Sequence, residues 1–187
     1  MFTSEINSAL KVLKTEQILL YPTDTVWGIG CDATSFEAVA KVFKIKQRSE
    51  SKSLIILVDG IEMLKQFIPT ISPEIMSVLE QVYNPTTIIY NHPIGLAKNV
   101  VASDDTVAIR IVQNEFCKQL ISEFGKPIVS TSANSSGYAT PKSFKEIEQS
   151  ILDSVDYVVD LQREVVNEKS STILKVAENG ELIVLRS

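Results

Sequence analysis

The sequence predicts a single α/β domain, spanning residues 1–187, that is built on a mixed β-sheet. Amphipathic helical segments alternate with short apolar runs along the chain, which is the pattern of strands interleaved with helices. Near the C-terminus, residues 172–176 and 182–185 are strand-like and flank Asn179-Gly180, a dipeptide typical of tight β-hairpins. A hairpin and short connections argue against a purely parallel, doubly wound sheet. The chain is also long enough to bury a substantial core.

The first third of the chain predicts two helices and two strands. Residues 5–14 place their apolar side chains on one helical face, and residues 18–21 form a short apolar strand that enters a loop rich in hydroxyls and glycines. A helix over 34–46 is expected to begin with the capping box Thr34–Glu37 and to turn its lysines outward. The continuous apolar run 54–58 predicts a central strand. The inward face of the helix over 34–46 comprises Phe36, Val39, Ala40 and Phe43.

The middle of the chain continues the alternation. Asp59 is the expected cap of a helix to residue 67, and Ser72, followed by proline, begins a helix over 72–82. Strands are predicted over 86–90 and 106–112, where β-branched residues are frequent.

The segment 91–105 reads as a loop, and we interpret His92 within it as a loop residue rather than a ligand. A helix over 114–124 follows, and then a buried strand over 128–130. A second capping-box pattern at Ser143 predicts a helix to residue 152, with a brief strand over 157–160 after it.

Bulk properties limit the classes of function. The chain is 44% apolar and 22% charged, which is ordinary for a globular protein. No apolar run approaches the roughly 20 residues that span a bilayer, and residues 1–5 lack the features of a secretory signal, so we expect a cytoplasmic location and no membrane. The net charge of -5 argues against a basic surface that wraps nucleic acid but leaves room for a local basic groove.

The cysteines and the histidine argue against a protein-bound metal. Cys31 and Cys117 are far apart and lack metal-ligand spacing, and His92 is the single histidine. We therefore expect no structural zinc, no disulfide and no Ser/His/Asp triad. A magnesium ion carried by nucleotide phosphates needs few protein ligands and stays compatible with the sequence.

A basic run follows the second predicted helix and suggests a phosphorylated ligand. Glu50 is the one acid that opposes it, and a solvated helix face is the alternative interpretation. The run comprises Lys41, Lys44, Lys46, Arg48 and Lys52.

Two other features predict ligand contacts, each with a structural alternative. Arg110 lies at the end of an apolar strand, where it either pairs with an acid or faces an anionic ligand. The polar stretch Ser130–Asn134 follows a buried strand, where α/β ligand sites usually open, although the same residues also form plain turns. Arg186, next to last, would ordinarily be a frayed surface charge.

Several motifs together resemble a known family. Pro22-Thr23-Asp24-Thr25 with Gly28, then Lys46-Gln47-Arg48, resembles the YrdC-like family of threonylcarbamoyl-AMP synthases. The resemblance extends in the family's order through three more elements, Val107–Arg110, Ser130–Gly137 and Ser170–Ile173. It implies a twisted, open mixed sheet with helices around a concave cavity.

The resemblance also implies an activity and a set of site residues. Such enzymes form threonylcarbamoyl-AMP and pyrophosphate from L-threonine, bicarbonate and ATP, with Mg²⁺ carried by the nucleotide, and a downstream transferase passes the product to tRNA. Thr25 and Ser171 would hold threonine, and Lys46 and Arg48 would also act in catalysis. Arg110 would bind an anionic group that the resemblance does not specify. The implied ATP-binding set is Lys46, Arg48, Arg110, Ser132, Asn134 and Arg186.

Other functions stay open. One is a tRNA- or double-stranded-RNA-binding paralogue without synthase activity, which would use the basic run on phosphates. Another is the carbamoyl-adenylate chemistry of a hydrogenase-maturation enzyme that contains this domain, which the short length disfavours. The chain departs from the family pattern at Trp27, Gln47, Ser53 and Val58.

Overall fold

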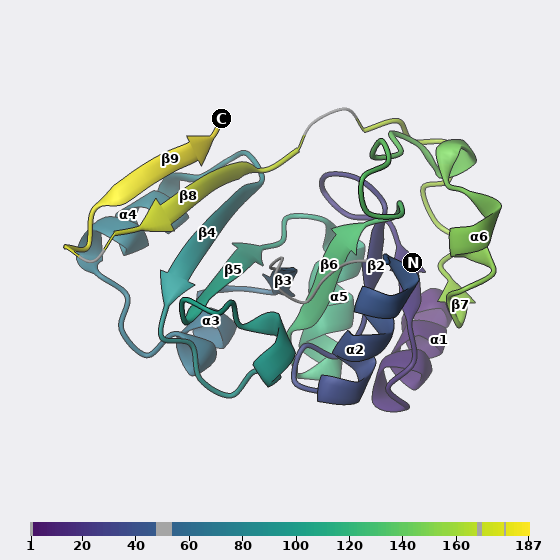
Figure 1. Cartoon of the computed structure of the whole chain (residues 1–187), viewed down its shortest axis with the longest axis horizontal. Coiled ribbons are helices and arrows are strands. Elements are labelled where there is room, and N and C mark those ends of the chain that lie inside the picture. Colours follow the sequence, from purple (N-terminus) through teal and green to yellow (C-terminus); the bar gives the residue numbers. More distant parts are fainter. Residues whose placement is uncertain (1, 48–53, 168–169, 178) are drawn as a thin grey trace.

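A computed structural model describes residues 2–47, 54–167, 170–177 and 179–187 (Figure 1). The helices are α1 (Thr3–Lys14), α2 (Phe36–Ile45), α3 (Ile61–Phe67), α4 (Pro73–Gln81), α5 (Glu115–Phe124) and α6 (Gln149–Leu152), with 3₁₀ turns η1 (Lys98–Val100) and η2 (Phe144–Glu146). The strands are β1 (Leu19–Tyr21), β2 (Gly28–Gly30), β3 (Ile55–Val58), β4 (Thr86–Asn91), β5 (Thr106–Ile111), β6 (Ile128–Ser132), β7 (Tyr157–Val158), β8 (Thr172–Val176) and β9 (Leu182–Arg186).

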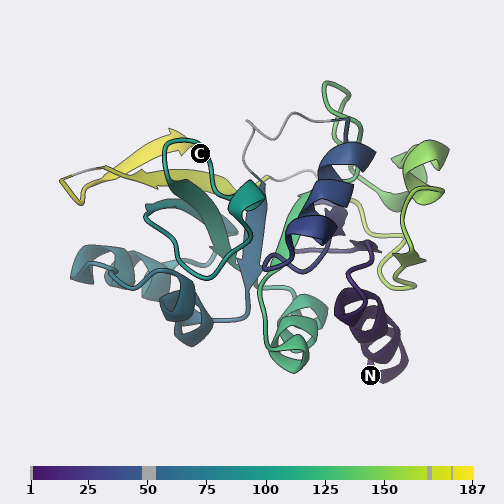
Figure 2. The same cartoon turned by 60° about the horizontal axis from the view of Figure 1, so that its bottom comes forward.

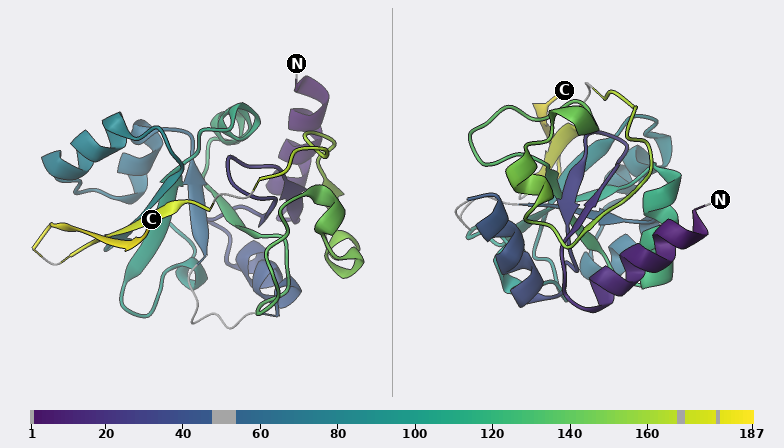
Figure 3. Two further views of the ribbon diagram at one scale, coloured as in Figure 1. Left: turned by 90° about the horizontal axis from the view of Figure 1, so that it is seen from above. Right: turned by 90° about the vertical axis from the view of Figure 1, so that its right-hand side faces the viewer.

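The strands of the described residues form one mixed sheet in the order β7-β1-β2-β6-β3-β5-β4-β8-β9. The pairs β1/β7, β3/β5 and β4/β8 are parallel, and the others are antiparallel. Helices α1, α3, α4 and α5 cover one face, whereas α2 lies on the other (Figures 2 and 3). The predicted mixed sheet and its C-terminal hairpin, β8/β9, are therefore confirmed.

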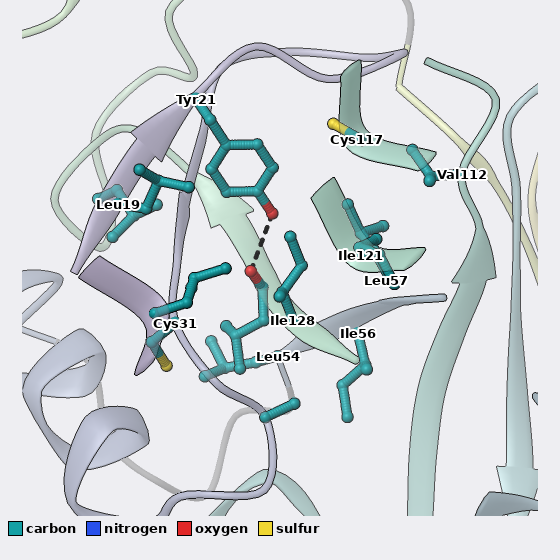
Figure 4. Close-up of a cluster of buried hydrophobic side chains, with 14 of the residues drawn as sticks. Leu19, Tyr21, Cys31, Leu54, Ile56, Leu57, Val112, Cys117, Ile121 and Ile128 are labelled. Atoms are coloured by element: carbon teal, nitrogen blue, oxygen red, sulfur yellow. Dashed lines mark hydrogen bonds between the residues drawn. The ribbon is translucent and has the colours of Figure 1, made fainter. Parts of the chain in front are cut away.

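The core lies around the central strands and the helices that cover them. Ile6 and Leu13 on α1 are buried, as the amphipathic pattern predicts, and each such side chain contributes about 1.5–3 kcal/mol on burial. The buried Tyr21 donates its hydroxyl to the Val129 carbonyl at 2.9 Å (Figure 4). A Cβ added at Gly30 would lie 2.2 Å from that carbonyl oxygen, so glycine is required for the close approach of β2 and β6.

Two helix starts differ from the prediction. Ser35, not Thr34, caps α2, because its hydroxyl accepts from Ala38 N at 3.2 Å while Thr34 is bound to Asp32. Phe36 is half exposed rather than buried, since it lies in the first turn of the helix. Helix α3 begins after Gly60 without a side-chain cap, so the prediction of Asp59 as the cap was wrong.

Three segments hold elements that the sequence did not predict. Strand β2 lies inside the predicted loop after β1. It was missed because its two glycines are typical of loops, whereas here they allow a close contact between strands. The segment 91–105 includes η1. The helix predicted over 143–152 is η2 followed by the short α6, and Ser143 makes no capping bond to the backbone. Within the described parts of the chain, no helix has both the length and the apolarity to cross a membrane.

Candidate active site

A cavity of about 610 Å³ opens on one face of the sheet. Its wall takes every second residue of neighbouring strands, such as Thr87 on β4 and Arg110 on β5, which pair in register. The alternate residues, including Ile88 and Ile109, are buried on the opposite face. The polar lining residues are Thr25, Thr87, Arg110, Ser130, Thr131, Ser132, Thr140, Lys142, Asn167, Ser170, Ser171 and Arg186.

The cavity wall carries positive charge. Three of its lining residues among those described are cations, Arg110, Lys142 and Arg186, and no described carboxylate lines it. This local excess of positive charge contrasts with the net charge of -5 of the whole chain. A concave wall of one charge sign concentrates ligands of the opposite sign, so the cavity favours an anionic ligand.

Arg110 is buried yet reaches this wall. Its side chain is 3% exposed, and its Nη2 lies 3.0 Å from Asp24 Oδ1 and donates to Thr25 Oγ1 at 3.3 Å. Arg110 therefore pairs with an acid, as one of the two alternatives predicted, and it also lines the cavity. Arg110 Nε and Asp24 Oδ1 have no hydrogen-bond partner among the described residues, so the ion pair is close but poorly aligned for a hydrogen bond.

Thr25 is fixed by its own loop. Thr23 Oγ1 accepts from Thr25 N at 3.0 Å and donates to Val26 O at 2.8 Å, and the two threonine hydroxyls lie 3.1 Å apart. Because the Thr23 proton goes to Val26, Thr25 donates to Thr23 and accepts from Arg110. The chain of hydrogen bonds holds the Thr25 side chain at the cavity wall.

A second set of hydrogen-bonded side chains lies on the same cavity wall, beside β4, β8 and β9. Thr87 Oγ1 and Ser171 Oγ lie 2.9 Å apart, and both side chains are buried. Arg186 donates from Nε and Nη2 to Ser171 O at 3.1 and 2.8 Å. Arg186 is therefore anchored by β9 pairing with β8 and is not a frayed end. Sequence reasoning gave no role to Thr87, since a threonine in a strand is ordinary by propensity.

Lys46 supports the loop after β6 from behind. Its side chain is 1% exposed, and Nζ donates to Ser132 O at 2.5 Å and to Asn134 O at 2.6 Å. Asn134 in turn donates Nδ2 to Tyr138 O at 2.7 Å. Ser132 lines the cavity, whereas Lys46 and Asn134 are not among its lining residues. The expectation that the lysines of this helix face outward was wrong for Lys46.

The basic run divides between residues that the structure describes and residues that lie outside them. Arg48, Lys52 and the opposing Glu50 lie outside the described residues, as does Ser53. Lys41 and Lys44 line a separate cavity of about 510 Å³ together with Gln47, between α2 and α6.

The other singled-out residues are placed as follows. Trp27 lines the main cavity and packs on Phe144, with ring centroids 4.9 Å apart. Val58 is fully buried in β3, and His92 is an exposed loop residue whose Nδ1 lies 2.6 Å from Asp105 Oδ2.

The site's chemistry is electrostatic positioning. Burial raises the pKa of the Tyr21 hydroxyl and of the Cys117 thiol, so neither side chain supplies an anion at neutral pH. In the part of the chain that is described, no three His, Cys, Asp or Glu side chains gather as a metal site. Cations, hydroxyls and backbone groups remain, and such groups bind and align anionic ligands.

The fold and cavity define an α/β protein whose mixed sheet carries a cavity lined by cations and hydroxyls. The chain belongs to the Sua5/YciO/YrdC family, whose model, described as "Telomere recombination", matches residues 11–187. The threonylcarbamoyl-AMP synthase of Pseudoalteromonas translucida is 35% identical over 185 residues, covering 96% of each chain.

Solved structures agree with this membership. P. abyssi Sua5 in complex with L-threonine is 25% identical, with a TM-score of 0.86, over 97% of this chain and 53% of that chain. The chain thus spans about half the length of that structure. Full-length HypF in a phosphate- and nucleotide-bound form is also 25% identical, with a TM-score of 0.84, over 97% of this chain and 28% of that one.

Proposed function

We propose that residues 1–187 act as one domain, an L-threonylcarbamoyladenylate synthase. L-Threonine and bicarbonate condense to a carbamate with loss of water, and a carbamate oxygen then attacks the α-phosphorus of ATP and releases pyrophosphate. The observation that carries the proposal is the single cavity that combines three cations with the hydroxyls of Thr25, Thr87 and Ser171. The relative named threonylcarbamoyl-AMP synthase and the threonine complex of Sua5 support the choice of reaction.

We assign threonine to the end of the cavity that holds Thr25, Arg110 and Ser171. Arg110 contacts Thr25 directly, and it faces Thr87, a partner of Ser171, across the β4–β5 pair. An arginine fork matches the geometry of a carboxylate, so we assign Arg110 to the carboxylate of threonine and not to the ATP-binding set in which the resemblance placed it. The neighbouring hydroxyls can then hydrogen-bond the substrate hydroxyl, which distinguishes threonine from an aliphatic amino acid.

ATP is assigned to Ser132 and Arg186, which line the cavity, and to Asn134 in the loop that follows β6. Arg48, which lies outside the described residues, completes the proposed set. Lys46 contributes by holding the Ser132–Asn134 loop in place, and its assignment as a direct phosphate ligand remains a prediction. The nucleotide would bring Mg²⁺ with it, and that ion would neutralise phosphate charge. The protein supplies the remaining positive charge and aligns the carbamate with the α-phosphorus.

The reaction benefits from a walled cavity. A carbamate loses carbon dioxide readily in water, so partial enclosure by Trp27, Leu54 and Ile55 protects it until it attacks. The product is an activated acyl adenylate, and we propose that a downstream transferase passes its threonylcarbamoyl group to tRNA.

An RNA-binding paralogue is the second candidate. The observation that favours it is the exposed pair Lys41 and Lys44, which lies outside the main cavity. Lys41, however, donates to Glu16 O at 2.8 Å, so one of these ammonium groups already has a protein partner. RNA binding through phosphates would weaken steeply as the salt concentration rises. A filter-binding series from about 50 to 300 mM salt would detect this loss of affinity.

The proposed function is tested by pyrophosphate release from ATP in magnesium buffer. Release that needs both L-threonine and bicarbonate, and that Arg110→Met reduces at least about tenfold in kcat/KM for threonine, supports it. Arg163→Met is the matched control, because Arg163 is a partly exposed arginine that pairs with Asp160. Pyrophosphate release that does not depend on threonine would overturn the proposed function.

A further inference from the structure

Asp24 is a buried acid that sits behind the cavity wall. Its side chain is 7% exposed, and its partner Arg110 is 3% exposed. Among the ion pairs of the described residues, this is the one in which both side chains are more than nine-tenths buried. Asp24 itself does not line the cavity, whereas Arg110 does.

One carboxylate oxygen of Asp24 accepts a hydrogen bond, and the other makes a close ion-pair contact. Oδ2 accepts from Gln113 N at 3.1 Å, and Oδ1 lies 3.0 Å from Arg110 Nη2. The same Nη2 also donates to Thr25 Oγ1. The loop before β2 thus holds one end of the guanidinium through two successive residues, and β5 supplies its backbone.

A buried acid–arginine pair is a weak source of stability, because desolvating both charges offsets most of their attraction. Arginine also has a long flexible stem, and its direction needs to be set before it can bind a carboxylate in two-point fashion. Asp24 is placed to set that direction without touching the ligand.

We propose that Asp24 is a positioning residue: it fixes the Arg110 guanidinium at the cavity wall so that the arginine receives the carboxylate of the amino-acid substrate. This inference rests on the proposed function. A purely structural role for Asp24 is the alternative, in which its loss lowers stability without a selective effect on threonine.

The chain offers a matched control. Asp32 is 6% exposed in its side chain, accepts from Thr34 N at 2.8 Å and from Thr34 Oγ1, and pairs with Lys126 Nζ at 2.7 Å. It is a buried, ion-paired aspartate like Asp24, but neither it nor Lys126 lines the main cavity. Asp32→Asn therefore reports the general cost of neutralising a buried carboxylate.

The test begins with Asp24→Asn. An asparagine has one oxygen and one NH₂ group, yet one Asp24 oxygen accepts from Gln113 N and the other contacts Arg110, so the NH₂ must oppose either Gln113 N–H or Arg110. We expect the KM for threonine, and its Kd by calorimetric titration, to rise at least about tenfold, while the KM for ATP changes less than about twofold. Asp24→Glu, which restores the charge, recovers most of the affinity. Asp32→Asn lowers Tm but leaves both KM values unchanged.

Coupling to Arg110 separates positioning from structure. If Asp24 acts through the arginine, Asp24→Asn lowers threonine affinity in the wild-type background but causes no further loss when it is added to Arg110→Met. Asp32→Asn, in contrast, lowers Tm by the same amount in both backgrounds. The double variant also removes both charges of the buried pair, so it stays available if Asp24→Asn alone does not fold.

The outcomes are distinct. Undiminished threonine binding by folded Asp24→Asn, or an effect that persists in full in the Arg110→Met background, overturns the inference and leaves the proposed function standing. If the wild-type protein binds threonine but releases no pyrophosphate, the proposed function is wrong. The role of Asp24 is then still tested by the calorimetric titration with threonine. Wild-type protein that binds no threonine overturns both.

Discussion

Replacing Lys46 with methionine will destabilise the loop that follows β6. The substitution keeps the length of the side chain and removes the ammonium. In the native structure this ammonium donates to Ser132 O and Asn134 O at 2.5 and 2.6 Å, and it lies 3.4 Å from Asn134 Oδ1. Without it, backbone oxygens that are buried or nearly so lose a charged donor.

The size of the effect follows from these contacts. Two short hydrogen bonds to a charged group contribute roughly 1.5–3 kcal/mol each, and relief of the buried charge offsets part of the loss. We expect a net destabilisation of about 2–4 kcal/mol, which is a large part of a typical total of roughly 5–15 kcal/mol. For a chain of this length, the change corresponds to a fall in Tm of about 6–12 °C.

The assay combines urea unfolding with ATP titration. Lys44→Met, on the exposed side of the same helix, is the matched control and should leave the unfolding midpoint within about 0.2 M of wild type. Lys46→Met should show both a lower midpoint and weaker ATP binding, because the loop that carries Ser132 and Asn134 is displaced. Unchanged stability with weakened ATP binding would refute the loop-support reasoning and show that Lys46 acts directly on the nucleotide.

Three further predictions follow from buried or cavity-lining groups. Gly30→Ala should lower stability by about 3 kcal/mol, measured by calorimetry, because its Cβ meets a backbone oxygen, and a Tm near wild type would contradict this. Burial raises the thiol pKa of Cys31 and Cys117, so the folded state disfavours the thiolates. The free energy of unfolding therefore keeps its full value below the unfolded-state thiol pKa of about 8.5 and falls as the pH rises above it. A urea midpoint unchanged between about pH 7 and pH 10 would contradict that. Lys142→Met should raise the KM for ATP several-fold, whereas Lys145→Met, whose lysine pairs with Glu164 away from the cavity, should not.

Periodicity was sufficient to predict much of the fold. Apolar spacing located α1, and a continuous apolar run located β3. The order of helices and strands, with a terminal hairpin, led to a mixed sheet. Strand β2 escaped prediction because it is three residues long and two of them are glycines, a composition that local patterns assign to loops.

Part of the candidate site was predicted from motif resemblance and not from periodicity. Thr25, Arg110 and Ser171 come together in one cavity, and motif resemblance had singled them out. Thr87 and Asp24 had no role assigned, because their significance lies in cross-strand register and in burial behind Arg110. No local sequence signal encodes either feature.

Lys46 and Arg186 show the same limit from opposite directions. A lysine at a helix end and an arginine near a terminus both read as surface charges. Lys46 is buried because the loop after β6 packs over its ammonium, and Arg186 is anchored because β9 pairs with β8. Both outcomes depend on segments distant in sequence, so only the assembled sheet reveals them.

The most direct measurement supplies ATP, L-threonine and ¹³C-labelled bicarbonate, and follows the nucleotide products by mass spectrometry. The account predicts an adenylate that contains both threonine and the labelled carbon, formed together with pyrophosphate and strongly diminished in Arg110→Met. ATP that is bound but not consumed, or an adenylate that lacks the label, would contradict the central claim that this cavity joins threonine, bicarbonate and ATP.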